Sequence, residues 1–67
     1  MSVAKVTEIS ATSEKSFDDA VREGIARANK TLKNISGAWV NEMKVDCQEG
    51  KITQFRVIMK VTFVLEE

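Results

Sequence analysis

The side chains of this 67-residue chain that could hold a ligand lie on two segments. Trp39 is the single tryptophan and the chain has no tyrosine, so its indole is the largest flat surface on which a planar ligand could stack. Gln54 and Arg56 stand at alternate positions of a later segment and offer hydrogen bonds and a positive charge. A structural interpretation stays open, in which Trp39 fills an interface between subunits and Arg56 pairs with a neighbouring carboxylate.

The sequence lacks most of what an enzyme needs. It has no histidine, and Asp18 and Asp19 are explained more simply as favourable charges at a helix N-terminus than as an acid–base pair. The three glycines are scattered, which excludes a glycine-rich phosphate loop. Cys47 is interpreted as a small apolar residue rather than a redox group. We therefore expect a protein without catalytic residues.

A metal site has similarly little support. Glu42, Asp46 and Glu49 could supply oxygen ligands to Ca²⁺ between subunits, but their spacing does not follow a calcium-binding loop. Solvated carboxylates on a strand are the simpler explanation. A single cysteine without histidine excludes an internal disulfide and argues against zinc or an iron–sulfur cluster.

The element that would carry Gln54 and Arg56 is a long strand over residues 52–65. Its odd positions from Phe55 to Leu65 are all apolar, which predicts a face packed on a core. Its even positions mix polar and apolar side chains, namely Ile52, Gln54, Arg56, Ile58, Lys60, Thr62 and Val64. A chain of this length with one helix can cover one sheet face, so we expect the even face to meet copies of the same chain.

A shorter strand is predicted over residues 3–10, followed by a helix that Thr12 or Ser13 would cap. The helix is predicted from one apolar stripe formed by Phe17, Val21, Ile25, Ala28, Leu32 and Ile35. Gly37 would take a left-handed conformation just beyond its end. Gly24 lies inside the helix at a cost of about 1 kcal/mol relative to alanine, and could permit close approach to a neighbouring element.

A further strand over residues 38–48 contains a break in its alternation. Its apolar residues stand first at even and then at odd positions, namely Ala38, Val40, Met43, Val45 and Cys47. A bulge near Asn41 and Glu42 would return both sets to one face.

The hairpin that joins the last two strands is predicted from the same pattern. If Met43 and Val45 oppose Val57 and Phe55, the loop has three residues, 49–51, in which Gly50 supplies a positive φ. The predicted fold is α+β: a β-α-β-β order in which one helix packs across one face of a three-stranded antiparallel sheet.

Composition restricts the partners. Ten basic and ten acidic residues are interspersed and give zero formal charge, so no nucleic-acid partner is expected. No apolar run approaches the roughly 20 residues that span a bilayer, so we expect no membrane partner and a cytoplasmic location. A single domain over 1–67 buries only about 60% of its unfolded surface, so the chain is expected to assemble with itself.

Short motifs along the chain resemble the dodecin family. They are Met-Ser-Val-Ala-Lys-Val at 1–6, Thr12-Ser13, Arg27-Ala28, Lys30-Thr31-Leu32, Gly50-Lys51-Ile52 and the segment from Val57 to Phe63-Val64-Leu65-Glu66. Their order covers essentially the whole chain. The resemblance implies a hollow homododecamer of β-α-β-β subunits, and a binding and storage protein that holds a flavin (riboflavin, FMN or FAD) as stacked pairs. Some relatives are associated with coenzyme A or metal ions instead.

The resemblance also identifies positions for a flavin site. The family tryptophan that stacks on the flavin ring falls on Gly37, and the family glutamine of the last strand falls on Arg56. Trp39 and Gln54 stand two residues away on the same strand faces, so a remodelled site of Gly37, Trp39, Gln54 and Arg56 is expected. The alternative is a dodecin-like assembly that has lost flavin and binds a metal ion such as calcium, or coenzyme A, or is purely structural.

Overall fold

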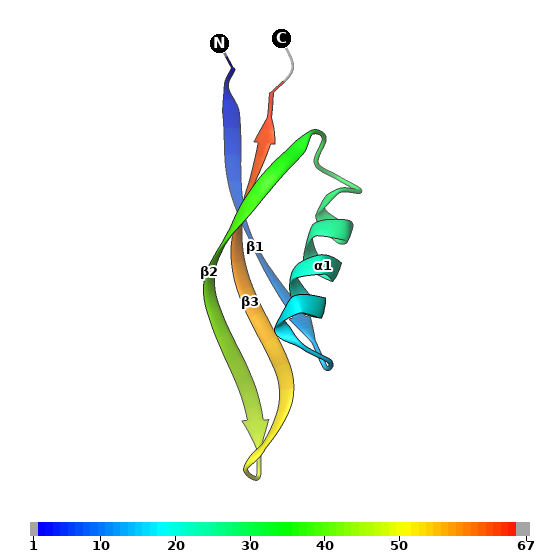
Figure 1. Cartoon of the computed structure of the whole chain (residues 1–67), viewed down its shortest axis with the longest axis vertical. Coiled ribbons are helices and arrows are strands. Elements are labelled where there is room, and N and C mark those ends of the chain that lie inside the picture. The colour runs from blue at the N-terminus through cyan, green and yellow to red at the C-terminus, as the bar shows by residue number, and fades with distance from the viewer. Residues whose placement is uncertain (1, 66–67) are drawn as a thin grey trace.

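The computed structural model describes residues 2–65, and its elements follow the order β-α-β-β (Figure 1). They are strand β1 (Ala4–Ser13), helix α1 (Phe17–Ala28), strand β2 (Ile35–Gln48) and strand β3 (Lys51–Val64). The antiparallel sheet has the strand order β1-β3-β2, so β3 lies at its centre. The predicted α+β fold is confirmed. Two residues of the dodecin-like motifs, Met1 and Glu66, lie outside the described residues.

The apolar odd face of β3 forms the core, as predicted. Val57, Met59 and Val61 are each 0% exposed, and Ala20 of α1 packs on the first two of them. The predicted inward row is too long at its end, because Leu65 follows the last residue of β3 and is exposed. The central strand therefore supplies the three largest fully buried side chains among the described residues.

Strand β1 continues further than predicted, and this moves the start of the helix. Ser13 still pairs with Phe55 in the sheet, and its buried hydroxyl accepts the N–H of Lys15 at 2.9 Å and donates to Asp19 Oδ2 at 2.6 Å. The helix cap is Ser16, whose Oγ accepts the N–H of Asp19 at 2.9 Å. The prediction of Thr12 or Ser13 as the cap is wrong, because the Ser13 hydroxyl holds the turn that precedes α1.

The helix also ends earlier than the apolar stripe suggested. It stops at Ala28, with Asn29 as its C-cap, and Ile35 already belongs to β2. Asn34, rather than Gly37, takes the left-handed conformation, with φ 62°. Its carbonyl accepts the N–H of Val64 at 3.0 Å, which ties the connection to the end of β3. The turn into the sheet therefore interrupts a stripe that the sequence alone would continue.

Small residues line the buried side of α1. Ala20, Gly24 and Ala28 are buried at successive turns, while Phe17, Val21 and Ile25 pack beside them. A Cβ atom on Gly24 would lie 2.8 Å from Met59 Cε and 2.9 Å from Ala11 Cβ. The expectation that Gly24 permits close approach is confirmed: the neighbour is the sheet itself.

The predicted bulge of β2 is present. Val40 pairs with Met59 and Glu42 with Ile58, so Asn41 is the extra residue. Beyond the bulge, the ladder from Glu42 to Asp46 is regular and keeps the predicted opposition of Met43 to Val57 and of Val45 to Phe55.

The predicted three-residue hairpin loop is wrong. Gln48 pairs with Lys51, which leaves Glu49 and Gly50 as a two-residue loop with φ 52° and 80°. Two positive φ values match the right-handed twist of the flanking strands. Thr53 is an extra residue in β3, because Asp46 pairs with Gln54 and Cys47 with Ile52. This second bulge produces the same pairing of Met43 with Val57 that the three-residue loop predicted.

The helix covers only part of the sheet. It packs against β1 and β3, and the hairpin of β2 and β3 extends beyond its N-terminal end in a molecule measuring 51 × 19 × 14 Å (Figure 1). Val40 and Met43 of β2 share the inner face with the core, yet they are 45% and 58% exposed. The predicted helix cover therefore holds for β3 and leaves the inner face of β2 open.

Candidate ligand-binding face

The face of the sheet that points away from α1, here called the outer face, carries all four residues predicted for the site. It is built from even positions of β3 and their partners in β1 and β2. The cross-strand rows are Val6–Thr62–Gly37, Glu8–Lys60–Trp39, Ser10–Ile58–Glu42, Thr12–Arg56–Lys44 and Gln54–Asp46. The bulge at Asn41 is what brings Trp39 onto the same face as Gln54 and Arg56.

Trp39 presents its indole to solvent beside an open position. Its side chain is 62% exposed, and it stands opposite Lys60. A Cβ atom added to Gly37, two residues before Trp39 on the same face, would meet nothing within 4 Å, so the position over Gly37 is open. Phe17 and Phe55 pack edge to face with ring centroids 5.1 Å apart, while Phe55 and Phe63 stand at odd, inward positions of β3. Trp39 is therefore the aromatic residue that a flat ligand on the outer face would meet.

Arg56 is held by a carboxylate of its own chain. Its guanidinium donates to Asp46 Oδ2 at 2.8 Å, and the Lys44 ammonium lies 3.9 Å from the other oxygen of Asp46. The hydrogen bond from Arg56 lowers the pKa of Asp46, with the charges of Arg56 and Lys44 acting in the same direction and burial opposing them. The interpretation of Arg56 as a partner of a carboxylate is thus supported, and its charge is already engaged.

This ion pair predicts an acid-dependent contribution to stability. Because folding lowers the pKa of Asp46, the unfolded chain binds the proton first as the pH falls. The stabilisation is complete above the ordinary aspartate pKa and is lost as the pH falls through the lowered folded-state value. We expect the wild type to be more stable than Asp46→Asn near neutral pH, with the difference vanishing in acid. Urea unfolding of both proteins across this range measures it, and a constant difference would contradict it.

The structure does not bring all four predicted residues to one point. Gly37 lies close to Trp39, two residues earlier on the same face. Lys60, opposite Trp39, stands four positions along β3 from Arg56, which at about 3.3 Å per position is about 13 Å. Gln54 lies one row further along the strand. Within one subunit, Trp39 therefore lies near Gly37, Lys60 and Thr62. Gln54 and Arg56 form a separate group around Asp46.

Lys60 and Thr62 were not predicted as site residues. The register of β3 contained the signal, because the parity of Trp39 already indicated Lys60 as its cross-strand neighbour. The open Gly37 position gives both residues access to the space beside the indole.

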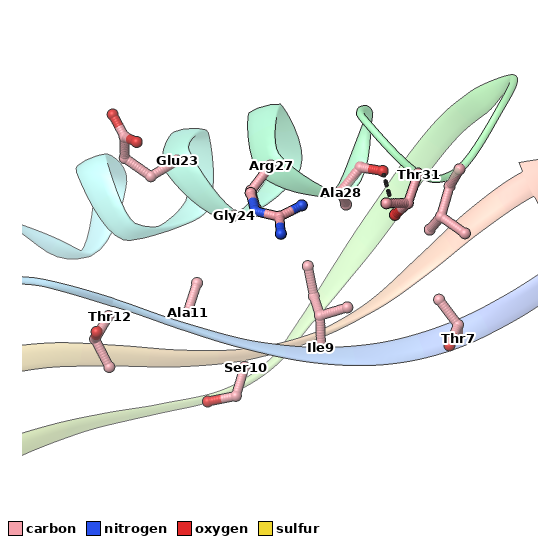
Figure 2. A pocket seen from close by; sticks show the side chains of 11 residues that line it. Thr7, Ile9, Ser10, Ala11, Thr12, Glu23, Gly24, Arg27, Ala28 and Thr31 are labelled. Atoms are coloured by element: carbon pink, nitrogen blue, oxygen red, sulfur yellow. Dashed lines mark hydrogen bonds between the residues drawn. The ribbon is translucent and has the colours of Figure 1, made fainter.

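A concave surface lies elsewhere, between α1 and β1. It has a volume of about 630 Å³ and is lined by both elements and the turn after the helix. Figure 2 shows Ile9 and Ala11 pointing from β1 toward α1 while Ser10 points away. Gly24 and Ala28 form its opposite wall, and Glu23 and Arg27 also line it. The groove has no aromatic lining residue and mixes apolar with polar and charged side chains, so it offers no platform for stacking.

A sequence profile of the Dodecin family matches residues 3–66. The chain belongs to the dodecin family. It is 34% identical over 65 residues to a dodecin of Thermus thermophilus, a match that covers 97% of this chain and 94% of that one. Its structure matches a dodecin from Streptomyces davaonensis with a TM-score of 0.94 and 39% identity, over 98% of this chain and 97% of the other. The resemblance expected from the motifs is confirmed.

A calcium-chelating dodecin of Mycobacterium tuberculosis, whose crystal structure has a novel calcium-binding site, matches with a TM-score of 0.82 and 32% identity. That match covers 96% of this dodecin and 91% of the mycobacterial chain. Within residues 2–65 of this dodecin, no three His, Cys, Asp or Glu side chains are grouped so that they could hold a metal ion. Asp46, the central member of the predicted Glu42, Asp46 and Glu49 set, is paired with Arg56.

The described part of this dodecin also bears on two smaller predictions. Cys47, interpreted as a small apolar residue rather than a redox group, is a free, exposed thiol near the hairpin. None of the helices between residues 2 and 65 is long and apolar enough to cross a membrane.

Proposed function

We propose that this dodecin is a non-enzymatic flavin-binding and storage protein, and that Trp39 stacks on the flavin ring. The observation that carries the proposal is the exposed indole beside the open Gly37 position, on a chain of this family. A flavin ring is flat, and stacking of a base on an aromatic side chain contributes about 1–3 kcal/mol. The tryptophan position implied for the family falls on Gly37, so the indole would reach the ligand from two residues further along β2.

The proposed function also requires that the chain assembles into a homododecamer, with the ligand between subunits. Support comes from the apolar surface that one subunit leaves uncovered: the groove beside β1, the inner face of β2 at Val40 and Met43, and Trp39 itself. Several large apolar side chains left exposed on so short a chain favour association, which would bury them. Because Trp39 and the group around Gln54 and Arg56 lie apart in one chain, a ligand between subunits could contact both. The number twelve comes from the family resemblance.

Calcium is the less favoured ligand. The Asp46 carboxylate is occupied by Arg56 and Lys44, and a cation would have to displace both. No feature of the described residues favours coenzyme A over a flavin. The flavin proposal is therefore the one to test first.

The direct test is flavin fluorescence, which stacking on an indole quenches. Riboflavin and FMN should be titrated with wild-type protein, Trp39→Ala and Trp39→Phe. Removal of the indole is expected to weaken binding about 5- to 150-fold, corresponding to about 1–3 kcal/mol. The phenylalanine variant keeps a smaller flat ring and should retain intermediate affinity.

Oligomer size must be followed in the same samples, because Trp39 could also contribute to an interface. Loss of quenching with the assembly intact assigns Trp39 to the ligand. Equal quenching by wild type and Trp39→Ala would remove Trp39 from the site, and absence of quenching in the wild type would refute flavin binding.

A further inference from the structure

Lys60 is positioned to act on whatever stacks against Trp39. The two residues are direct cross-strand partners on the outer face, a relation that sets their Cβ atoms about 4.5–5.5 Å apart. Lysine carries its charge on a flexible four-carbon stem with three donors, so the ammonium can reach a group at the edge of the indole. The Thr62 hydroxyl, opposite the open Gly37, lies on the same side.

The charge of Lys60 is uncommitted, unlike that of the other outer-face cations. Arg56 and Lys44 both lie within ion-pair distance of Asp46. Among the residues that the structure describes, Lys60 belongs to none of the ion pairs, and its side chain is exposed. A negatively charged group brought to Trp39 would therefore meet Lys60 as its nearest free cation on this face.

We propose that Lys60 makes the Trp39 site select a planar ligand that also carries negative charge, so that FMN binds more tightly than uncharged riboflavin. The inference rests on the proposed stacking role of Trp39. The preference arises because the indole of this chain stands at position 39, whereas the tryptophan position implied for the family falls on Gly37. A ring stacked at position 37 would stand opposite Thr62, whereas one at position 39 stands opposite a cation.

Glu8 limits this selectivity for FMN, and its replacement offers a second test of it. It is the partner of Lys60 on the other side, in β1, and so competes for the same ammonium. No Glu8–Lys60 ion pair lies within 4.0 Å among the described residues, so the competition is electrostatic rather than a formed contact. Replacing Glu8 by glutamine should therefore strengthen FMN binding and leave riboflavin binding unchanged.

The experiment compares riboflavin and FMN on the full chain by fluorescence quenching. Wild type is expected to prefer FMN by about 3- to 10-fold, between the effect of an exposed ion pair and that of a charge-assisted hydrogen bond. Lys60→Gln should abolish the preference by weakening FMN alone, and Lys60→Arg should preserve it. Lys5→Gln removes the same charge from the opposite face of β1 and should leave the ratio unchanged. Added salt should reduce the wild-type ratio.

The outcomes separate this inference from the proposed function. Equal affinity of the wild type for the two flavins, or equal loss of both in Lys60→Gln, would overturn the role of Lys60 while flavin binding stands. Quenching by neither flavin would overturn both. A ratio that Lys5→Gln lowers as much as Lys60→Gln would assign the preference to net charge and also overturn the inference.

Discussion

Gly24→Val is expected to cause the largest loss of stability of any single substitution considered for this chain. The first added carbon would already lie 2.9 Å from Ala11 Cβ, which is fixed to the backbone of β1 and cannot rotate away. Met59 Cε, at 2.8 Å, can move only within a core where Met59 is fully buried. Overpacking of this kind costs about 1–3 kcal/mol and sometimes more, out of a total of about 3–10 kcal/mol for a chain of this size.

Ala26→Val is the matched control, because Ala26 is exposed on the same helix and the change adds the same β-branching. It should lower stability by less than about 1 kcal/mol, the cost of helix propensity alone. Thermal unfolding at equal protein concentration should place Gly24→Val below the control, by about 4–8 °C for each kcal/mol of overpacking. Similar midpoints for the two variants would mean that α1 does not sit as close to β1 and β3 as the structure has it.

The alternation of β3 and β2 made much of this fold predictable. Buried Val57 and Met59, the bulge at Asn41 and the pairing of Met43 with Val57 all follow from apolar parity, because successive side chains of a strand point to opposite faces. The predicted loop length was wrong because two different loop arrangements give the same strand register. A three-residue loop and a two-residue loop with an extra residue at Thr53 cannot be told apart by parity.

The helix ends were less predictable because their signals are local and shared. Ser13 and Ser16 are both good capping residues, and only the tertiary contact of Ser13 with Asp19 decides between them. The apolar stripe ran on into Leu32 and Ile35 because a helix and the strand that follows it can bury residues on the same side of a core. The apolar periodicity contains no signal of the turn at Asn34.

The candidate site was predictable as a face and not as a set of contacts. Parity placed Gly37, Trp39, Gln54 and Arg56 on the outer face, yet it carries no information on which carboxylate Arg56 would meet. Asp46 lies ten residues from Arg56 and reaches it only through the hairpin register. The free charge of Lys60 likewise emerges by elimination, once the partners of the other cations are known.

Ile58→Lys is expected to dissociate the proposed assembly without unfolding the subunit. Ile58 is the apolar centre of the outer face, half-buried in one chain between Ser10 and Glu42. In the isolated subunit a lysine at position 58 would stand opposite Glu42 of the neighbouring strand β2. Such an oppositely charged cross-strand pair contributes about 0.2–1 kcal/mol to stability. In an interface the same charge would have to be desolvated, which costs several kcal/mol per ion. The substitution therefore separates assembly from folding.

Ile58→Val is the matched control, since it keeps the face apolar and costs about 0.5–1.5 kcal/mol. Sedimentation should give a large species for the wild type and the valine variant and a small one for the lysine variant, with circular dichroism alike in all three. Retention of size and thermal stability by Ile58→Lys would mean that this face is solvated in the assembly. The contacts between subunits would then have to come from the groove beside β1 and the exposed inner face of β2 at Val40 and Met43.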